Sequence, residues 1–368
     1  MSTRVMKLSL VSCWMIVGFF LASPAQAAPT RSEHRVPGVA GIQLSVREVR
    51  DKGKSASGLP PVILLHGARV PGRASFDLPV AGGSLAADLA LAGHTVFVMD
   101  ARGYGGSTRP AAMRVPATGR PLVSSYEVVQ DVHAVVTWVK KRTRQPRVAL
   151  LGWATGGHWL GMYASLHPEE VSHLVVLNAL YAGGAQHAML GRGTSFEDPK
   201  RPGQFNAEGM EAWRWNTAAS LLGVWDRSIP MEDKSQWRSP EVAESLQREA
   251  LASDTLSGSR TPPAFRAPSG ALEDSFYLAT GRQLWDAASI TSRVLIIRSE
   301  KDFWSRPEDV TVLQEHLVHA ASVKAIVIPE ATHFVHLDRP ERGRDLFLRE
   351  VLGFFSPTQA TPAPGAGQ

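Results

Sequence analysis

The sequence of 368 residues predicts a doubly wound α/β fold, in which helices cover both faces of a mostly parallel sheet. The first observation is a series of short, continuously apolar runs, which are typical of strands buried on both faces. These runs lie at 61–65, 95–99, 148–151, 173–177, 293–297 and 323–328. The second observation is helical periodicity between them, at 84–92, 126–142, 155–166, 308–320 and 341–355. Strand and helix therefore alternate, which favours right-handed crossovers.

Two segments depart from this rhythm. Residues 42–49 alternate apolar and polar side chains, as a half-buried antiparallel strand does. Residues 182–288 are rich in Gly, Pro and aromatic side chains and contain no continuous apolar run of the kind described above. We interpret this stretch as a mostly helical cap inserted into a core made of 28–181 and 289–355. Such a cap would overhang the carboxyl ends of the strands, where α/β sheets bind their ligands.

The N-terminus predicts export. Arg4 and Lys7 precede an apolar run at 8–22, and Ala25-Gln26-Ala27 gives a small-x-small ending. This pattern is typical of a secretory signal peptide, 1–27. An uncleaved membrane anchor is less consistent with it, because a membrane-spanning helix needs about 20 apolar residues and the run at 8–22 is shorter. We expect a periplasmic or secreted protein with no stable membrane insertion after cleavage. The only cysteine, Cys13, lies in this segment, so the mature chain would have no disulfide and no thiolate ligand.

Charge and the C-terminus add two expectations. The formal net charge is +5, but the basic residues are scattered and the longest basic cluster is 140–144. A nucleic-acid partner is therefore not expected, since such surfaces concentrate their positive charge. The tail 356–368 is rich in Pro and Ala without apolar periodicity, which predicts disorder.

Four motifs follow the predicted strands in order. They are His66-Gly67-Ala68, Asp100 to Ser107 with its glycines, Gly152-Trp153-Ala154-Thr155-Gly156-Gly157, and the pair Asp302 and His333 after the last two strands. In this order the chain resembles the α/β-hydrolase superfamily, from about residue 36 to 355. The resemblance implies a sharp strand-to-helix turn, the nucleophile elbow, with residue 154 at its exposed apex.

The resemblance also implies roles for individual residues. The backbone amides of Ala68 and Thr155 would form the oxyanion hole. Asp302 would orient His333, which would move the proton. His66 and Trp153 stand at substrate-binding positions, although Trp153 could equally pack between sheet and helix.

The departure from the family pattern is at the apex, where G-W-A-T-G replaces G-x-S-x-G. Loss of the triad serine slows a protease by ~10⁶-fold, so acyl-enzyme chemistry at Ala154 is excluded. Three explanations remain open: an engineered Ser-to-Ala change, a natural site in which His333 and Asp302 activate water or act as a base, and a natural binding module. Thr155 is a poor substitute nucleophile because the first helical turn should aim its hydroxyl away from the apex.

Metal and cofactor sites are not expected. The pairs His316/His319 and His333/His336 have suitable spacing but no third ligand nearby in sequence. Asp100 more plausibly ties its loop than reacts, and the neutral Asn178 leaves empty the position where some family members carry their acid. The sequence thus predicts an ester-hydrolase-type protein acting on or binding a small, largely apolar carbonyl compound. The alternative is an inactive exported ligand-binding protein on the same fold.

Overall fold

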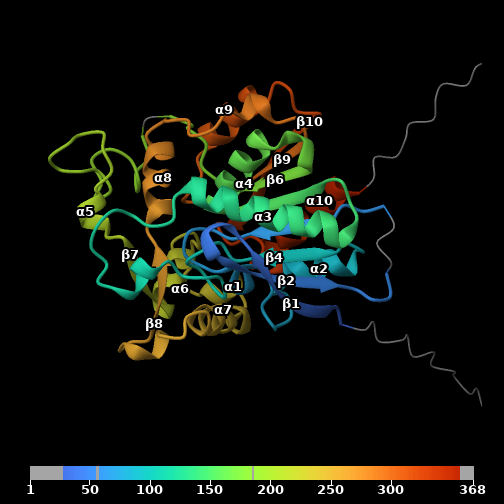
Figure 1. Cartoon of the computed structure of the whole chain (residues 1–368), viewed down its shortest axis with the longest axis horizontal. Helices are drawn as coiled ribbons and strands as arrows, with labels where there is room; N and C mark the ends of the chain where they lie inside the picture. Colours follow the sequence, from blue (N-terminus) through green and yellow to red (C-terminus); the bar gives the residue numbers. More distant parts are fainter. Residues whose placement is uncertain (1–27, 55–57, 185, 357–368) are drawn as a thin grey trace, which may run out of the picture.

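The computed structural model describes residues 28–54, 58–184 and 186–356, so the predicted signal peptide and nearly all of the predicted tail lie outside the described residues. Eight strands form one sheet in the order β1-β2-β4-β3-β5-β6-β9-β10 (Figure 1). Their bounds are β1 Thr30–Pro37, β2 Gln43–Arg50, β3 Val62–Leu65, β4 Val96–Met99, β5 Val148–Trp153, β6 Val171–Leu177, β9 Arg293–Lys301 and β10 Ser322–Thr332. All neighbours from β4 to β10 pair in parallel, whereas β1 and β2 are antiparallel. The predicted fold class is confirmed.

Helices cover both faces of the sheet. Their bounds are α1 Gly72–Phe76, α2 Leu85–Leu91, α3 Ser125–Thr143, α4 Thr155–Leu166, α9 Pro307–His316 and α10 Arg344–Phe355. The buried side chains of α3, α4 and α9 pack with one set of strand residues, and those of α1, α2 and α10 pack with the other. Each central strand therefore buries both of its faces, which explains its continuously apolar sequence.

Three details differ from the sequence analysis. Strand β1 was not predicted, because its sequence is polar and only Val36 is buried among its eight residues. The short helix α1 was also missed. Helix α10 begins at Arg344 rather than at 341, because Pro340–Arg342 form a separate 3-10 turn and Gly343, at φ 101°, reverses the chain.

The segment predicted as a cap, 182–288, is not purely helical. It contains α5 Ala207–Met210, β7 Trp213–Thr217, α6 Ala218–Asp226, α7 Pro240–Ala252, β8 Ala264–Pro268 and α8 Gly270–Ala279. Strands β7 and β8 form a separate antiparallel pair, which Figure 1 shows beside the main sheet. We call this segment the insertion. Trp225 of α6 and Leu246 of α7 join the core on the α10 side, so the insertion packs against the sheet domain.

No helix among the described residues is long and apolar enough to cross a membrane.

Candidate active site

The turn between β5 and α4 has the geometry of a strained elbow. Ala154 lies between them at φ 53° and ψ −121°, a conformation that costs a residue with a Cβ about 1–3 kcal/mol. Its amide donates to the carbonyl of Leu177 at 2.8 Å. Gly156 is required for close packing, since a Cβ there would lie 2.2 Å from the carbonyl oxygen of Leu65. The turn thus brings the start of α4 directly against β3 and presents residue 154 at the carboxyl edge of the sheet.

The two predicted oxyanion donors lie around this apex. Ala68 and Thr155 both line the same cavity as Ala154. Within the described part of the chain, neither of their backbone amides donates to another residue. The carbonyl of Ala68 accepts a hydrogen bond from the Tyr104 hydroxyl at 2.9 Å, which fixes the loop. Both amides are therefore available to an oxygen placed in the cavity.

His333 and Asp302 form the predicted pair. The His333 Nδ1 lies 2.6 Å from Asp302 Oδ1, and the ring also lines the cavity. With Nδ1–H donating to the carboxylate, Nε2 is left as the proton acceptor. Burial alone would raise the pKa of Asp302, but the charge of His333 and hydrogen bonds from His333 and Ser305 lower it below its ordinary value. Asp302 is thus held ionised, as the orienting group of an acid–base pair must be.

Two further side chains position His333 through its backbone. The Trp153 indole Nε1 donates to the His333 carbonyl at 2.9 Å, and the Asn178 amide donates to the same oxygen at 3.1 Å. Trp153 also lines the cavity, and its ring centroid lies 5.1 Å from that of His333. From the sequence, Asn178 was noted only as a neutral residue at a position where some family members carry their catalytic acid. A neutral donor suits the position because it binds a carbonyl oxygen.

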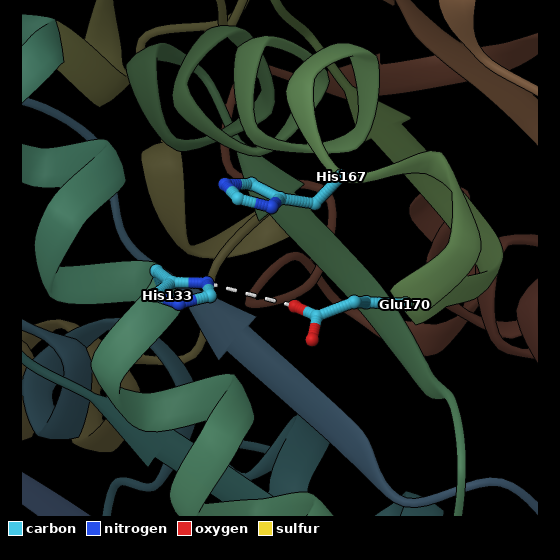
Figure 2. Close-up of side chains that lie close together, drawn as sticks. All are labelled: His133, His167 and Glu170. Atoms are coloured by element: carbon cyan, nitrogen blue, oxygen red, sulfur yellow. Dashed lines mark ion pairs between the residues drawn. The ribbon is translucent and has the colours of Figure 1, made fainter.

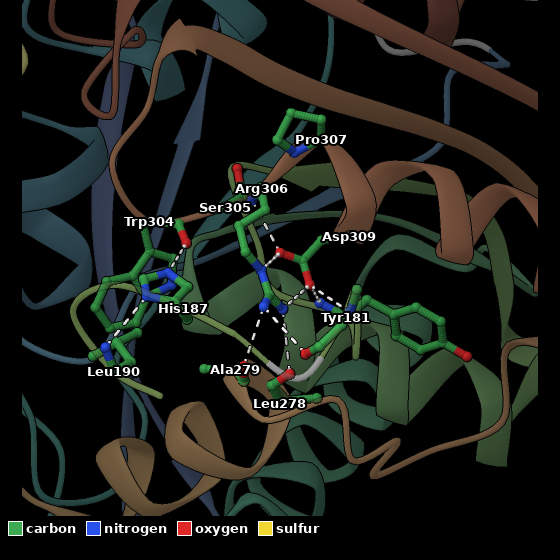
Figure 3. A network of polar contacts seen from close by, with 12 residues as sticks. Tyr181, His187, Leu190, Leu278, Ala279, Trp304, Ser305, Arg306, Pro307 and Asp309 are labelled. Carbon is green, nitrogen blue, oxygen red and sulfur yellow. Dashed lines mark hydrogen bonds and ion pairs between the residues drawn. The ribbon is translucent and has the colours of Figure 1, made fainter. Parts of the chain in front are cut away.

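The loop that carries Asp302 is anchored to the insertion (Figure 3). Arg306 pairs with Asp309 at 2.9 Å and donates to the carbonyls of Ala279 and Leu278 at the end of α8. The His187 ring bonds the carbonyl of Trp304 at 2.8 Å. The backbone amide of Trp304 in turn donates to Asp302 at 3.0 Å. Movement of the insertion would therefore disturb the acid–base pair, a connection that local sequence patterns did not reveal.

A cavity of about 290 Å³ connects these groups. The side chains from the insertion that line it are Met189, Leu190, Phe196, Arg214, Leu221, Val224, Arg227 and Leu272. His66 does not line it: its ring is fully buried, with Nδ1 2.6 Å from the Gly67 carbonyl and Nε2 accepting from the Ala101 amide. The predicted substrate contact of His66 is thus corrected to a structural role, because its two nitrogens hold the loop of the oxyanion hole.

The Thr155 hydroxyl is not placed as a nucleophile. Its Oγ1 is buried and has no hydrogen-bond partner among the described residues, His333 included. Asp100 ties its loop, as expected, by accepting from the amides of Gly72 and Gly106 at 2.7 and 2.9 Å.

Among the described residues, three potential metal ligands converge only at His133, His167 and Glu170 (Figure 2). Their ligand atoms lie within 4.8 Å of one another. The Glu170 carboxylate, however, already accepts hydrogen bonds from Lys140 and from the Tyr163 hydroxyl. His167 follows the C-terminal end of α4, about 18 Å of helix away from the elbow. This group therefore has no part in the cavity, and the expectation of a metal-free site stays a prediction.

In the two histidine pairs that have metal-ligand spacing in the sequence, the two members contact different partners. His316 bonds the Tyr181 hydroxyl at 3.2 Å, whereas His319 bonds the Ala288 carbonyl at 2.8 Å. His336 is buried against Trp153, and burial lowers its pKa to about 3.

Comparisons with known proteins support the fold. A family profile described as the alpha/beta hydrolase fold matches residues 60–340. A search of curated proteins found no match. An esterase from Exiguobacterium antarcticum is 19% identical with a TM-score of 0.53, covering 87% of this chain and 98% of its own. A proline iminopeptidase from Mycobacterium smegmatis is 19% identical with a TM-score of 0.55, covering 88% and 97%. E-2-(acetamidomethylene)succinate hydrolase is 19% identical with a TM-score of 0.54, covering 88% and 99%.

Proposed function

The chain belongs to the alpha/beta hydrolase fold family, and from that membership we propose that its cavity is the site of an ester hydrolase for small carbonyl compounds. The observation that carries the proposal is the His333–Asp302 pair, 2.6 Å apart, at a cavity that also contains the strained apex Ala154. Strain at a residue with no reactive group is costly unless the site requires that geometry. The elbow therefore retains the shape of a nucleophile position without the nucleophile.

The chemistry follows from where each group lies. A substrate carbonyl oxygen would accept hydrogen bonds from the amides of Ala68 and Thr155, which polarises the carbonyl and stabilises the oxyanion. With Ala154 the chain has no hydroxyl to attack, so no acyl-enzyme forms. His333 Nε2 could still take a proton from a water molecule, which would then attack the carbonyl carbon directly. We expect this route to be slow, because the elbow does not hold the water as it would hold a covalently attached oxygen.

The test compares the chain as it stands with the variant Ala154→Ser on short-chain aryl esters. A serine hydroxyl at this apex would stand in the cavity with His333 as its base, and we expect a gain approaching ~10⁶-fold in kcat. The variant Ala154→Val is the matched control, since it adds atoms without a hydroxyl and should give no gain. His333→Ala in the Ala154→Ser background should remove the activity.

The other outcomes decide between the alternatives. Equal activity in both proteins that is lost on His333→Ala would indicate that the site activates water directly and forms no acyl-enzyme. Inactivity in both, with an ester still bound, would leave a binding protein and overturn the proposal.

Export is a separate proposal, which rests on the N-terminal pattern around Ala25 and Ala27. Cell fractionation with N-terminal sequencing tests it. We expect a mature chain that begins at Ala28 outside the cytoplasm, and a cytoplasmic protein that retains Arg4 and Lys7 would refute it.

A further inference from the structure

Apolar side chains make up most of the cavity wall, but it also holds three arginines for which no ion pair is found among the described residues. Arg69, Arg214 and Arg227 line it, and none of its lining residues is Asp or Glu. From this group, and resting on the proposed function, we propose that the substrate is a carbonyl compound that also carries a carboxylate, which the three arginines bind. The apolar part of the wall suits the largely apolar compound expected from the sequence, whereas the arginines suit a charged group on that compound.

Arg214 gives the clearest evidence. Its Nε and Nη2 atoms are buried, and no described residue hydrogen-bonds them. Side chains alternate along β7, so Arg214 and Asn216 share one face while the tryptophans at 213 and 215 take the other. Burial lowers the pKa of Arg214, and the nearby Tyr104 and Glu211 offset this only in part. Buried donors without acceptors are rare, because each unmade hydrogen bond costs about 1–3 kcal/mol.

Arg69 and Arg227 place two more positive charges at the same wall. Arg69 donates only to neutral oxygens, those of Asn216 at 3.1 Å and Ser220 at 2.6 Å. Its burial, with the nearby charges of Arg214 and Arg227, lowers the pKa of Arg69 to about 10. Arg227 is exposed and stacks over the Phe303 ring at 5.4 Å. Like charges gathered in this way repel one another unless an anion joins them.

Other arginines that are buried within the described part of the chain show the contrast. Arg102 pairs with Asp131 at 2.7 Å, and Arg266 pairs with Asp254 at 2.7 Å. These two guanidinium groups, and that of the buried Arg344 beside Asp88, are matched to carboxylates within the protein. The missing carboxylate at the cavity is the one that a ligand would bring, in the planar geometry that guanidinium groups bind best.

The position of Arg69 sets where that carboxylate would lie. Arg69 follows Ala68, whose amide is an oxyanion donor, and it reaches the insertion, which carries Arg214 and Arg227. A substrate that spans both groups would have its reacting carbonyl at the elbow and its carboxylate toward the insertion. The arginines would then select the substrate and orient the carbonyl, without taking part in proton transfer.

The experiment is a binding measurement on the chain with Ala154, so it does not depend on turnover. Calorimetry would compare the monobenzyl esters of glutarate, adipate and suberate with benzyl pentanoate, hexanoate and octanoate, in which a methyl group replaces the carboxylate. We expect the best carboxylate ester to bind at least about tenfold tighter than its neutral match. This preference should weaken as salt is added.

Variants assign the effect to the arginines. Arg214→Met and Arg227→Met should each remove most of the carboxylate preference, measured as the ratio of the affinities for the charged and the neutral ester of one pair. Arg349→Met, at an exposed position on α10, is the control of equal net charge and should change nothing. If the buried Arg214→Met fails to fold by circular dichroism, the exposed Arg227→Met decides.

Three results would overturn the inference. They are equal affinity for charged and neutral esters, no binding of either, and a carboxylate preference that survives in Arg227→Met and in any folded Arg214→Met. Failure of the proposed function would give a different result. A carboxylate ester would then bind in an arginine-dependent way, but Ala154→Ser would not hydrolyse it.

Discussion

Asp338 makes the stability of the His333 turn depend on pH. Its carboxylate is 2% exposed and accepts hydrogen bonds from the Thr332 amide at 2.8 Å and from the Trp225 indole at 2.9 Å. No described cation pairs with it. Burial raises the pKa of Asp338 from 3.8 to about 7, although these hydrogen bonds partly oppose the rise. Thr332 directly precedes His333, so the group that titrates also holds the turn that carries the base.

The sign of the effect follows from proton binding. Between pH 3.8 and about 7 the folded chain keeps a proton on Asp338 that the unfolded chain has released. Its contribution to stability is therefore complete below pH 3.8 and is lost as the pH rises through 7. At about 1.4 kcal/mol per pH unit, the loss between pH 5 and pH 8 is on the order of 3 kcal/mol.

Asp338→Asn tests this reasoning, because the amide resembles the protonated carboxyl and does not titrate. Urea unfolding of both proteins at pH 5 and pH 8 would give their free energies of unfolding. We expect the variant to gain roughly 3 kcal/mol relative to the parent between the two pH values. Asp345→Asn, at an exposed position of α10, is the control and should follow the parent. If Asp338→Asn and the parent change in parallel with pH, Asp338 is ionised in the folded protein and the reasoning is wrong.

Two other substitutions test the acid–base pair and the elbow. In the Ala154→Ser background, Asp302→Asn should lower kcat by about 10⁴-fold because the histidine tautomer is lost; a fall of less than tenfold in initial rates would contradict the assigned role. Gly156→Ala should destabilise the protein by more than about 3 kcal/mol in thermal unfolding, since its Cβ would lie 2.2 Å from the Leu65 carbonyl oxygen. Gly223→Ala, in open space on α6, is its control and should raise stability by up to about 1 kcal/mol.

The parts of the fold that sequence predicts well are those whose residues are buried on both sides. Strands β3, β4 and β5 are fully buried, so their apolar runs are unbroken and their ends are clear. Strand β1 lies at the edge of the sheet and buries one residue, Val36. A polar edge strand is defined by its pairing with β2, which no local pattern records.

The site divides in the same way. Ala68, Ala154, Thr155, Asp302 and His333 each lie within three residues of the end of a strand. Because carboxyl ends of parallel strands meet at one edge, chain order predicts that these residues lie close together. His66 also follows a strand, yet its side chain turns into the core, where it bonds the Ala101 amide. Position after a strand therefore predicts where a residue's backbone lies and not the direction of its side chain.

The arginines show why substrate chemistry needed the structure. Arg69 precedes Arg214 by 145 positions, Arg227 follows Arg214 by 13, and each stands in a stretch of ordinary composition. Arg214 faces the cavity because β7 pairs with β8, which makes side chains alternate with a period of two; in a helix its direction would differ. Since what marks these residues is that they gather at one cavity without an ion pair among the described residues, the signal exists only after packing. In an α/β fold whose catalytic groups come from strand ends, the insertion is therefore the part that decides which molecule those groups meet.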